Sequence, residues 1–190
     1  MHRLTSSFVL GYHGCDRQVG ERLLEGALFE PSNNDYDWLG PGVYFWESNP
    51  QRGLEFAAEV SGRKRSRLKE PFVVGAVIDL GLCLDLTSSN GIQLVQASYH
   101  SFAEQTRLAG SSLPTNSGDS LRRALDCAVV KWLHVIRRRE RKPPADTVKG
   151  TFTEGGPAYP GAGFAMKTHT QIAVRNLECI KGVFRVPYPA

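Results

Sequence analysis

The spacing of hydrophobic and polar residues along the chain predicts a mixture of strands and helices. Short apolar runs typical of strands lie at residues 8–14, 42–46, 72–80, 148–152, 171–174 and 180–186. Helical spacing and helix-start residues predict helices after Asp16 and at residues 50–61, 91–109 and 120–139. Because strands and helices do not alternate strictly, the pattern favours an α+β fold over a doubly wound one.

Two of these segments also indicate which of their sides is buried. Residues 72–80 are apolar almost throughout, so they predict a central strand that is covered on both faces. In residues 120–139, a stripe of apolar residues recurs at helical spacing and predicts the face that packs on the core. The stripe consists of Leu121, Leu125, Ala128, Trp132 and Val135.

Length and composition predict one domain over residues 1–190. A chain of 190 residues can bury one core, and its 41% hydrophobic and 22% charged residues are ordinary values for a globular protein. No apolar stretch approaches the length of a membrane span, and the N-terminal segment lacks the layout of a signal peptide. We therefore expect a cytoplasmic protein without membrane contact.

Cysteine spacing and net charge exclude few classes of function. The four cysteines form no C-x-x-C pair, which argues against a zinc site and a disulfide framework and favours reduced thiols. The net charge is +4, and basic residues are concentrated at residues 63–69 and 137–142. The two runs could together form a basic face that binds phosphates, or each could be a solvated helix end.

Three stretches carry candidate functional side chains. His13 lies in GYHGCD at the end of the first strand, and Tyr44 lies in LGPGVYFWE, where alternation places it opposite Val43 and Phe45. Gln171 lies in THTQIAVRN, on the polar side of a strand whose apolar residues point the other way. Taken singly, each residue also has a structural explanation, as a buried histidine, a core tyrosine or a solvent-exposed glutamine.

Taken together, the three stretches resemble the ADP-ribosyltransferase superfamily, in particular the poly(ADP-ribose) polymerase-like branch with a His-Tyr-Glu triad. The resemblance rests on YHG at the first strand, LGPGVYF at the second and a late strand with a polar residue, and it spans nearly the whole chain. The phrases DYDWLGPGVYFWE, HTQIAVRN and CIKGVF also resemble bacterial proteins of toxin-like role. The resemblance to the ADP-ribosyltransferase superfamily implies split antiparallel sheets with flanking helices around an NAD-binding groove.

The resemblance also implies roles for individual residues, with NAD as co-substrate and no metal. His13 would hydrogen-bond the adenosine ribose, the Gly14 backbone would hold the nicotinamide amide, and Tyr44 would stack on the nicotinamide ring. Two further residues are candidates from their positions alone. Arg17, in the turn after the first strand, could bind the pyrophosphate or be simply exposed, and Trp38 is the best aromatic candidate for a lid.

The chain departs from the family at the third triad position, where Gln171 replaces the usual glutamate. A carboxamide can hydrogen-bond a ribose hydroxyl, but it brings no negative charge and cannot act as a general base. Three outcomes follow: Gln171 suffices for a reactive acceptor, another carboxylate substitutes for it, or NAD is bound without turnover. Glu154 is the first candidate substitute, and Glu47 is a second that could instead complement a helix dipole.

The leading hypothesis is a mono-ADP-ribosyltransferase that uses His13, Tyr44 and either Gln171 or Glu154. The basic runs favour single-stranded RNA or DNA over protein as the acceptor, and the toxin-like resemblance implies an antitoxin protein as a partner. One alternative is a catalytically silent NAD-binding or interaction module. Another is an NAD-dependent RNA phosphotransferase of the same superfold, which would need more arginines and histidines around the pocket.

Overall fold

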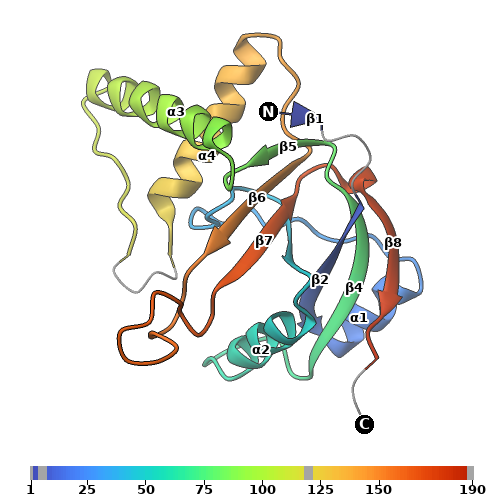
Figure 1. Ribbon diagram of the computed structural model, residues 1–190. Helices are drawn as coiled ribbons and strands as arrows, with labels where there is room; N and C mark the ends of the chain where they lie inside the picture. Colours follow the sequence, from blue (N-terminus) through green and yellow to red (C-terminus); the bar gives the residue numbers. More distant parts are fainter. Residues whose placement is uncertain (1, 4–7, 118–121, 188–190) are drawn as a thin grey trace.

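The computed structural model describes residues 2–3, 8–117 and 122–187 as a mixed sheet flanked by helices (Figure 1). The strands are β1 (His2–Arg3), β2 (Phe8–Asp16), β3 (Val43–Glu47), β4 (Pro71–Asp79), β5 (Leu82–Asp85), β6 (Thr147–Phe152), β7 (His169–Val174) and β8 (Ile180–Arg185). The helices are α1 (Arg17–Leu24), α2 (Pro50–Ser61), α3 (Ser89–Leu108) and α4 (Ala124–Arg139), and a 3₁₀ turn spans Leu177–Cys179. Every predicted strand and helix is present, so the α+β class is confirmed.

The described strands form an eight-stranded sheet in the order β1-β5-β6-β7-β3-β2-β4-β8. Neighbouring strands run antiparallel except for β5 and β6, which are parallel, so the expectation of purely antiparallel strands is wrong at that edge. Sequence patterning also missed β1 and β5. These segments of two and four residues are too short to show a hydrophobic period.

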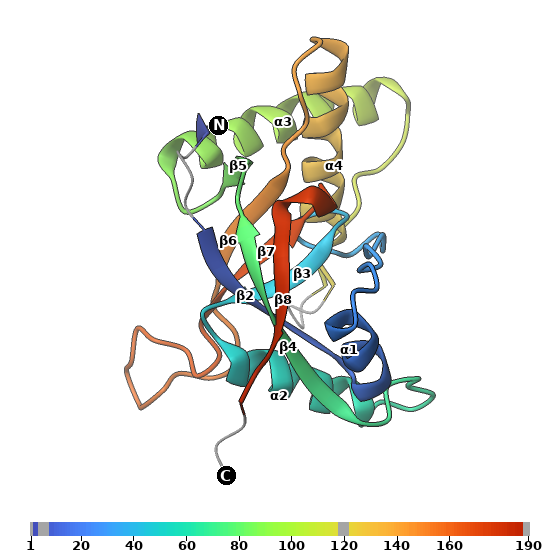
Figure 2. The same ribbon diagram turned by 90° about the vertical axis from the view of Figure 1, so that its right-hand side faces the viewer.

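The sheet has a narrow seam between β2 and β3. β2 pairs with β4 along its whole length, but it pairs with β3 only through Gly11 with Glu47 and Tyr12 with Trp46. Figure 2 shows β2, β4 and β8 crossing the direction of β6 and β7. The end of β2 that carries His13 therefore lies beside β3 without pairing to it.

Two buried clusters cover opposite faces of the sheet. The first joins both sides of the seam to α1, and its large members include Leu23, Phe45, Phe72, Ile78 and Ile172. The second joins α4 to the other face, and its members include Leu39, Leu84, Val130, Leu133 and Val148. Alternate residues of β3 and β7 reach different clusters, so both strands are buried on both faces.

The helix α4 differs from its sequence prediction in its start and in its buried face. It begins at Ala124, and residues 120–121, including Leu121 of the predicted stripe, lie outside the described part of the chain. The other members of the predicted stripe, Leu125, Ala128, Trp132 and Val135, are only half-buried, whereas the buried residues are Cys127, Val129, Val130, Leu133 and His134. The prediction was wrong because α4 packs on two elements. Val130 faces the sheet, while the Trp132 indole donates a hydrogen bond to Ser101 on α3.

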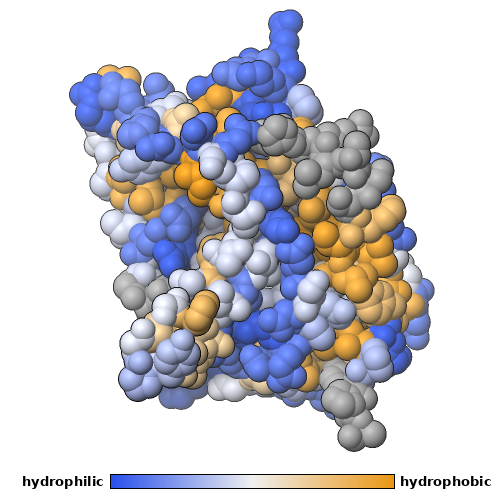
Figure 3. Space-filling view, viewed as in Figure 1, coloured by the Kyte–Doolittle hydropathy of each residue, from blue (hydrophilic) through white to orange (hydrophobic). Residues whose placement is uncertain are grey.

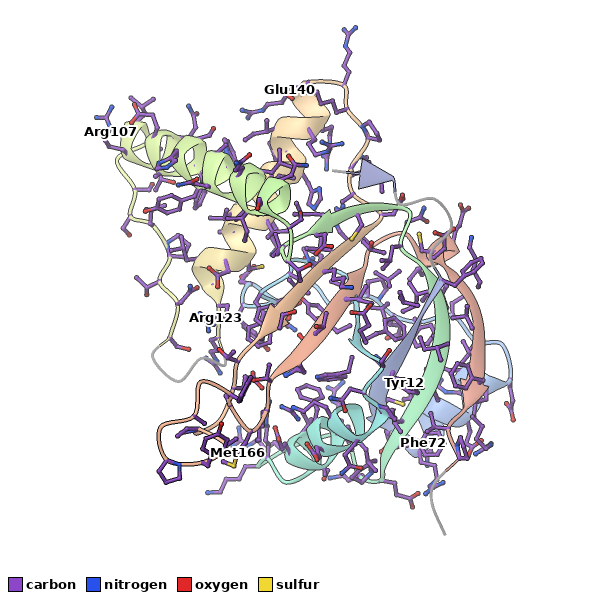
Figure 4. All side chains as sticks on the ribbon, in the orientation of Figure 1. Tyr12, Phe72, Arg107, Arg123, Glu140 and Met166 are labelled. Carbon is purple, nitrogen blue, oxygen red and sulfur yellow. The ribbon has the colours of Figure 1, made fainter. Side chains whose placement is uncertain are left out.

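The two basic runs lie far apart on the molecule. Residues 137–142 are at the top of Figure 1, at the end of α4, where Figure 4 labels Glu140, and residues 63–69 are near the bottom, after α2. Of the two alternatives, the one in which both runs form a single basic face is therefore wrong. The four cysteines are buried and unpaired. Within residues 2–3, 8–117 and 122–187, no helix is long and apolar enough to cross a membrane.

One face of the sheet is open to solvent at the start of β2. Figure 3 shows hydrophobic residues gathered there, on the right of the view. Phe8 and Leu10, at the start of β2, contribute exposed side chains. At its other end, β2 is covered by α2, and this covered end carries the residues of the candidate site.

Candidate functional site

His13 joins β2 to β3 through its side chain where the backbone pairing has ended. Its Nδ1 lies 2.8 Å from the carbonyl oxygen of Tyr44. A carbonyl can only accept, so Nδ1 carries the proton, and in the neutral ring Nε2 is an acceptor. The ring packs against Phe29 and Phe45, with centroids 5.4 and 5.6 Å away.

Burial fixes the charge state of this imidazole. It lowers the pKa of His13, and the hydrogen bond to the Tyr44 carbonyl opposes this effect only in part. The ring is therefore neutral at physiological pH. It offers Nε2 as an acceptor, which suits a hydroxyl donor such as that of a ribose.

Gly14 is a glycine because α2 packs directly onto it. A Cβ atom at this position would lie 2.1 Å from the carbonyl oxygen of Gly53, far inside van der Waals contact. The backbone N–H and C=O of Gly14 point away from α2, in the plane of the sheet. Leu10 accepts a hydrogen bond from the Ser48 amide on the β3 side, and every second residue of a strand points its N–H and C=O to the same side. The N–H and C=O of Gly14 therefore face the seam.

The Tyr44 phenol holds the preceding loop in place. Its oxygen donates to the Gly40 carbonyl at 2.8 Å and accepts from the Leu39 amide at 3.0 Å. Burial raises the pKa of Tyr44, so the phenol stays protonated. The ring lies on the face opposite the His13 imidazole, because Tyr44 pairs in register with Ala173 of the second cluster. The two residues thus meet through the Tyr44 backbone.

Gln171 lies on the same sheet face as Tyr44, in register with Trp46. It is 5% exposed, so the alternative explanation of a solvent-exposed glutamine is wrong. Its carboxamide oxygen accepts a hydrogen bond of 2.7 Å from the Trp38 indole. Trp38, in the loop before β3, therefore covers Gln171.

Three buried polar atoms around Gln171 have no hydrogen-bond partner among the described residues. They are Nε2 of His169, Nε1 of Trp46 and Nε of Arg52. The Nδ1 of His169 lies 2.7 Å from the Lys167 carbonyl, so its Nε2 is an acceptor, whereas the other two atoms are donors. Buried polar atoms normally have partners, so each of these atoms is a candidate to bind a polar atom of a ligand.

Glu154 lies beside these three atoms, but its carboxylate forms an ion pair with Arg52. Its carboxylate is 3.1 Å from Arg52, which is 6% exposed and also lies 3.3 Å from Glu59. The second candidate substitute, Glu47, is on the other face of the sheet and pairs with Lys149 at 2.8 Å. Of the two carboxylates, only Glu154 is near Gln171.

Arg17 lies at the outer end of β2, away from the seam. Its Nε is 2.9 Å from the Glu70 carboxylate, and its guanidinium lies over Phe72. Half of the side chain is exposed. The structure therefore brings His13, Gly14, Tyr44, Trp38, Gln171 and Glu154 around the seam and β7, and it leaves Arg17 outside this group.

Sequence reasoning missed several members of the site. Arg52 carried no signal, because a charged residue in the first turn of a helix is normally exposed. Trp46 and Phe152 looked like ordinary strand residues. His169, by contrast, was identifiable from the sequence as a candidate to assist Gln171, because it precedes Gln171 by two positions and strand alternation places the two on the same face. Among the described residues, no three His, Cys, Asp or Glu side chains are grouped as a metal ion would require.

Comparison with known proteins identifies no family. No protein-family model and no solved structure matches the chain. A stretch of 36 residues is 47% identical to part of "Uncharacterized protein MJ0359" of Methanocaldococcus jannaschii. The aligned stretch covers 19% of this chain and 17% of that protein. The chain thus aligns with about a sixth of its relative, whose name states no activity.

Proposed function

We propose that this protein is an NAD-dependent mono-ADP-ribosyltransferase with an ADP-ribosyltransferase-like fold that modifies a macromolecule. The observation that carries the proposal is the hydrogen bond between His13 and the Tyr44 carbonyl at the seam. It brings together two of the three stretches on which the family resemblance rests, and Gln171 of the third lies one strand away across β3.

The residues at the seam suit the parts of a dinucleotide. The Nε2 of His13 accepts from a ribose hydroxyl, and the N–H and C=O of Gly14 match the acceptor and donor of a carboxamide. Gln171, which lies on the sheet face opposite the His13 ring, hydrogen-bonds the ribose next to the nicotinamide, so the dinucleotide crosses the sheet at the seam where β2 and β3 no longer pair. The three unpartnered atoms around Gln171 supply further donors and an acceptor to a bound polar group.

An apolar hollow of about 320 Å³ lies beside Phe29, the residue that packs against the His13 imidazole. It is lined by α1, residues 26–29 and β8, and Phe29 both lines the hollow and contacts the imidazole. We assign it to the adenine ring, because a flat apolar surface suits a base whose ribose is bonded to His13.

The transfer step requires a proton acceptor. The bond between the anomeric carbon and the nicotinamide nitrogen breaks, and its electron pair neutralises the departing ring. A lone pair of the acceptor forms the new bond, and the proton of the acceptor leaves. Gln171 cannot take this proton, so it passes to His169 Nε2 or to the Glu154 carboxylate, whose charge is partly neutralised by Arg52.

Labelled NAD tests the proposal directly. The protein is incubated with NAD labelled in the adenylate part and with total RNA, DNA or lysate protein, and label is measured in each fraction together with free ADP-ribose. We expect label in one macromolecular fraction. His13→Ala and Gln171→Leu should each reduce it at least tenfold.

Matched variants separate the site from the rest of the molecule. His100→Ala and Gln105→Leu make the same chemical changes at exposed positions on α3 and should leave labelling unchanged. Absence of both macromolecular label and free ADP-ribose would overturn the proposed activity. Equal losses in the exposed variants would remove its assignment to this site.

A second candidate is a catalytically silent NAD-binding module. It is favoured by the contact between Trp38 and Gln171, because a neutral carboxamide held by an indole brings no negative charge to a developing cation. Calorimetry with NAD distinguishes the two functions. Heat of binding that is lost in His13→Ala, without nicotinamide release by the unmodified protein, supports the silent module.

A further inference from the structure

A stacked column of side chains extends from Gln171 towards the surface. The Trp38 ring lies on the Phe152 ring, with centroids 3.7 Å apart and an interplanar angle of 12°. The Arg123 guanidinium lies over Trp38, 5.8 Å from the ring centroid. Because Trp38 donates to Gln171, this column is attached directly to the candidate site.

A second arginine–aromatic pair lies next to the column. The Arg122 guanidinium is 5.5 Å from the centroid of Tyr36, whose side chain is 42% exposed. The Arg123 amide donates to the Tyr36 carbonyl at 3.3 Å, which joins the two pairs. We call Tyr36, Trp38, Arg122 and Arg123 the arginine–aromatic rim.

The loop of residues 153–168 starts directly after Phe152, at the base of the same column. Both of its ends are fixed on α2. Glu154 pairs with Arg52 at 3.1 Å, and Lys167 pairs with Glu59 at 2.8 Å. The base of the loop is therefore held beside the site, and its tip projects from the molecule (Figure 1).

The tip of this loop presents large apolar side chains to solvent. Tyr159 is 58% exposed and Phe164 is 71% exposed. Figure 4 labels Met166 in this loop and Arg123 of the rim, both near the ends of β6 and β7. Exposed aromatic rings on an anchored loop add little to the core, and such groups of residues are typical of binding surfaces.

We infer that the rim and the loop tip bind single-stranded nucleic acid as the acceptor, an assignment that rests on the proposed function. Bases stack on guanidinium planes and on the exposed rings of Tyr36, Tyr159 and Phe164. Arg122 and Arg123 neutralise backbone phosphates, which for Arg123 means replacing Asp126, 3.8 Å away, as its partner. A strand held in this way passes Trp38, so an exposed base or a ribose hydroxyl comes next to Gln171. A duplex would hide the base faces that these rings recognise, and an acidic peptide would need the charges but not the rings.

Binding is measured without NAD, which separates this inference from the proposed activity. The probes are fluorescein-labelled 20-nucleotide RNA and DNA single strands, the matching duplexes and a poly-glutamate peptide, and the readout is fluorescence anisotropy from 50 to 300 mM salt. We expect the single strands to bind at least tenfold more tightly than the duplexes or the peptide.

Two sets of variants test the surface. Arg122→Gln combined with Arg123→Gln should weaken single-strand binding at least tenfold and reduce the slope of log K against log salt by about 1.4. Phe164→Ser combined with Tyr159→Ser changes only exposed rings, so folding is preserved, and it should weaken binding at least tenfold at unchanged salt slope. Lys64→Gln combined with Arg138→Gln removes the same charge from the two basic runs and should have less than a twofold effect.

The outcomes are distinguishable. Equal loss of binding in the Lys64 and Arg138 variant, preferential binding of duplex or peptide, or unchanged binding in the aromatic variant would each overturn the inference. Label found only on protein would also overturn it, while leaving transferase activity in place. Single-strand binding at this surface without NAD turnover would refute the proposed activity and leave the binding surface intact.

Discussion

The His13 imidazole donates a hydrogen bond to the backbone carbonyl of Tyr44 at 2.8 Å, across the seam where β2 and β3 no longer pair. It thereby replaces one of the ladder hydrogen bonds that the strands do not make. The contact fixes the ring tautomer and turns Nε2 into the acceptor. It adds a side-chain contact between the first two motifs beyond the two backbone pairs of Gly11 with Glu47 and Tyr12 with Trp46.

Replacing His13 by Phe should keep the ring contacts with Phe29 and Phe45 but leave the Tyr44 carbonyl without its donor. We expect a loss of about 1–3 kcal/mol in the free energy of unfolding, measured by urea denaturation. His100→Phe, at an exposed position on α3, is the control and should change stability by less than about 0.5 kcal/mol. Equal stabilities of His13→Phe and the unmodified protein would contradict the hydrogen bond.

Gly14→Ala should destabilise the protein by about 3 kcal/mol, because its Cβ would collide with the Gly53 carbonyl and push α2 away from β2. Gly182→Ala on β8 is the matched control, since a Cβ there meets no atom within 4 Å. Thermal and urea unfolding of both variants give the comparison. If the two alanines cost the same, the close packing of α2 on β2 is wrong.

The Arg52–Glu154 pair should show strong coupling in a double-mutant cycle. Arg52→Met leaves the Glu154 carboxylate, which is 13% exposed, without its main partner and should cost about 3 kcal/mol. Adding Glu154→Gln should recover part of that loss, giving a coupling energy of about 1–3 kcal/mol. If Glu154 also accepts the proton of the acceptor, Glu154→Gln alone reduces transfer more than NAD hydrolysis, whereas a purely structural role reduces both equally.

Gln171→Glu should increase nicotinamide release from NAD at least tenfold, because a carboxylate stabilises the developing positive charge and still accepts from Trp38. Release is measured by chromatography of the nicotinamide product. A rate equal to that of Gln171→Leu would exclude a role for charge here.

The buried His134 should make the protein less stable as the pH falls below 6.5. Burial, together with the positive charges of Arg175, Arg137 and Arg138, lowers the pKa of His134 to about 3. The unfolded chain therefore binds a proton at His134 near pH 6.5, whereas the folded protein binds it only near pH 3. The free energy of unfolding consequently falls between pH 6.5 and 3. His13 and His169 have lowered pKa values and act in the same direction.

The His134→Gln variant isolates this contribution. Between pH 7.5 and 5.0 its unfolding free energy should fall by about 2 kcal/mol less than that of the unmodified protein. The measurement is urea denaturation at both pH values. His100→Gln, at an exposed position, should keep the pH dependence of the unmodified protein. An identical dependence in His134→Gln would show that this histidine has the same pKa in the folded and unfolded states, against the effect of its burial.

The sequence by itself determined the longer strands and helices and the positions of the motifs within them. Asp16 accepts a hydrogen bond from the Gln18 amide at the start of α1, and Asn49 caps α2, as local sequence signals predict. Residues 72–80 predicted a doubly covered strand, and β4 is buried along most of its length between β2 and β8. These features depend on contacts within a few residues, so periodicity and capping suffice to find them.

Only the tertiary structure decided which side chains meet. It covered Gln171 with Trp38, placed Arg52 in the interior beside Glu154, and directed Glu47 to Lys149 on the other face. It also turned α4 so that Val130 rather than Trp132 reaches the sheet. Each of these contacts joins segments that are distant in the chain. Their choice depends on how the helices and strands pack together, which no local pattern of residues contains.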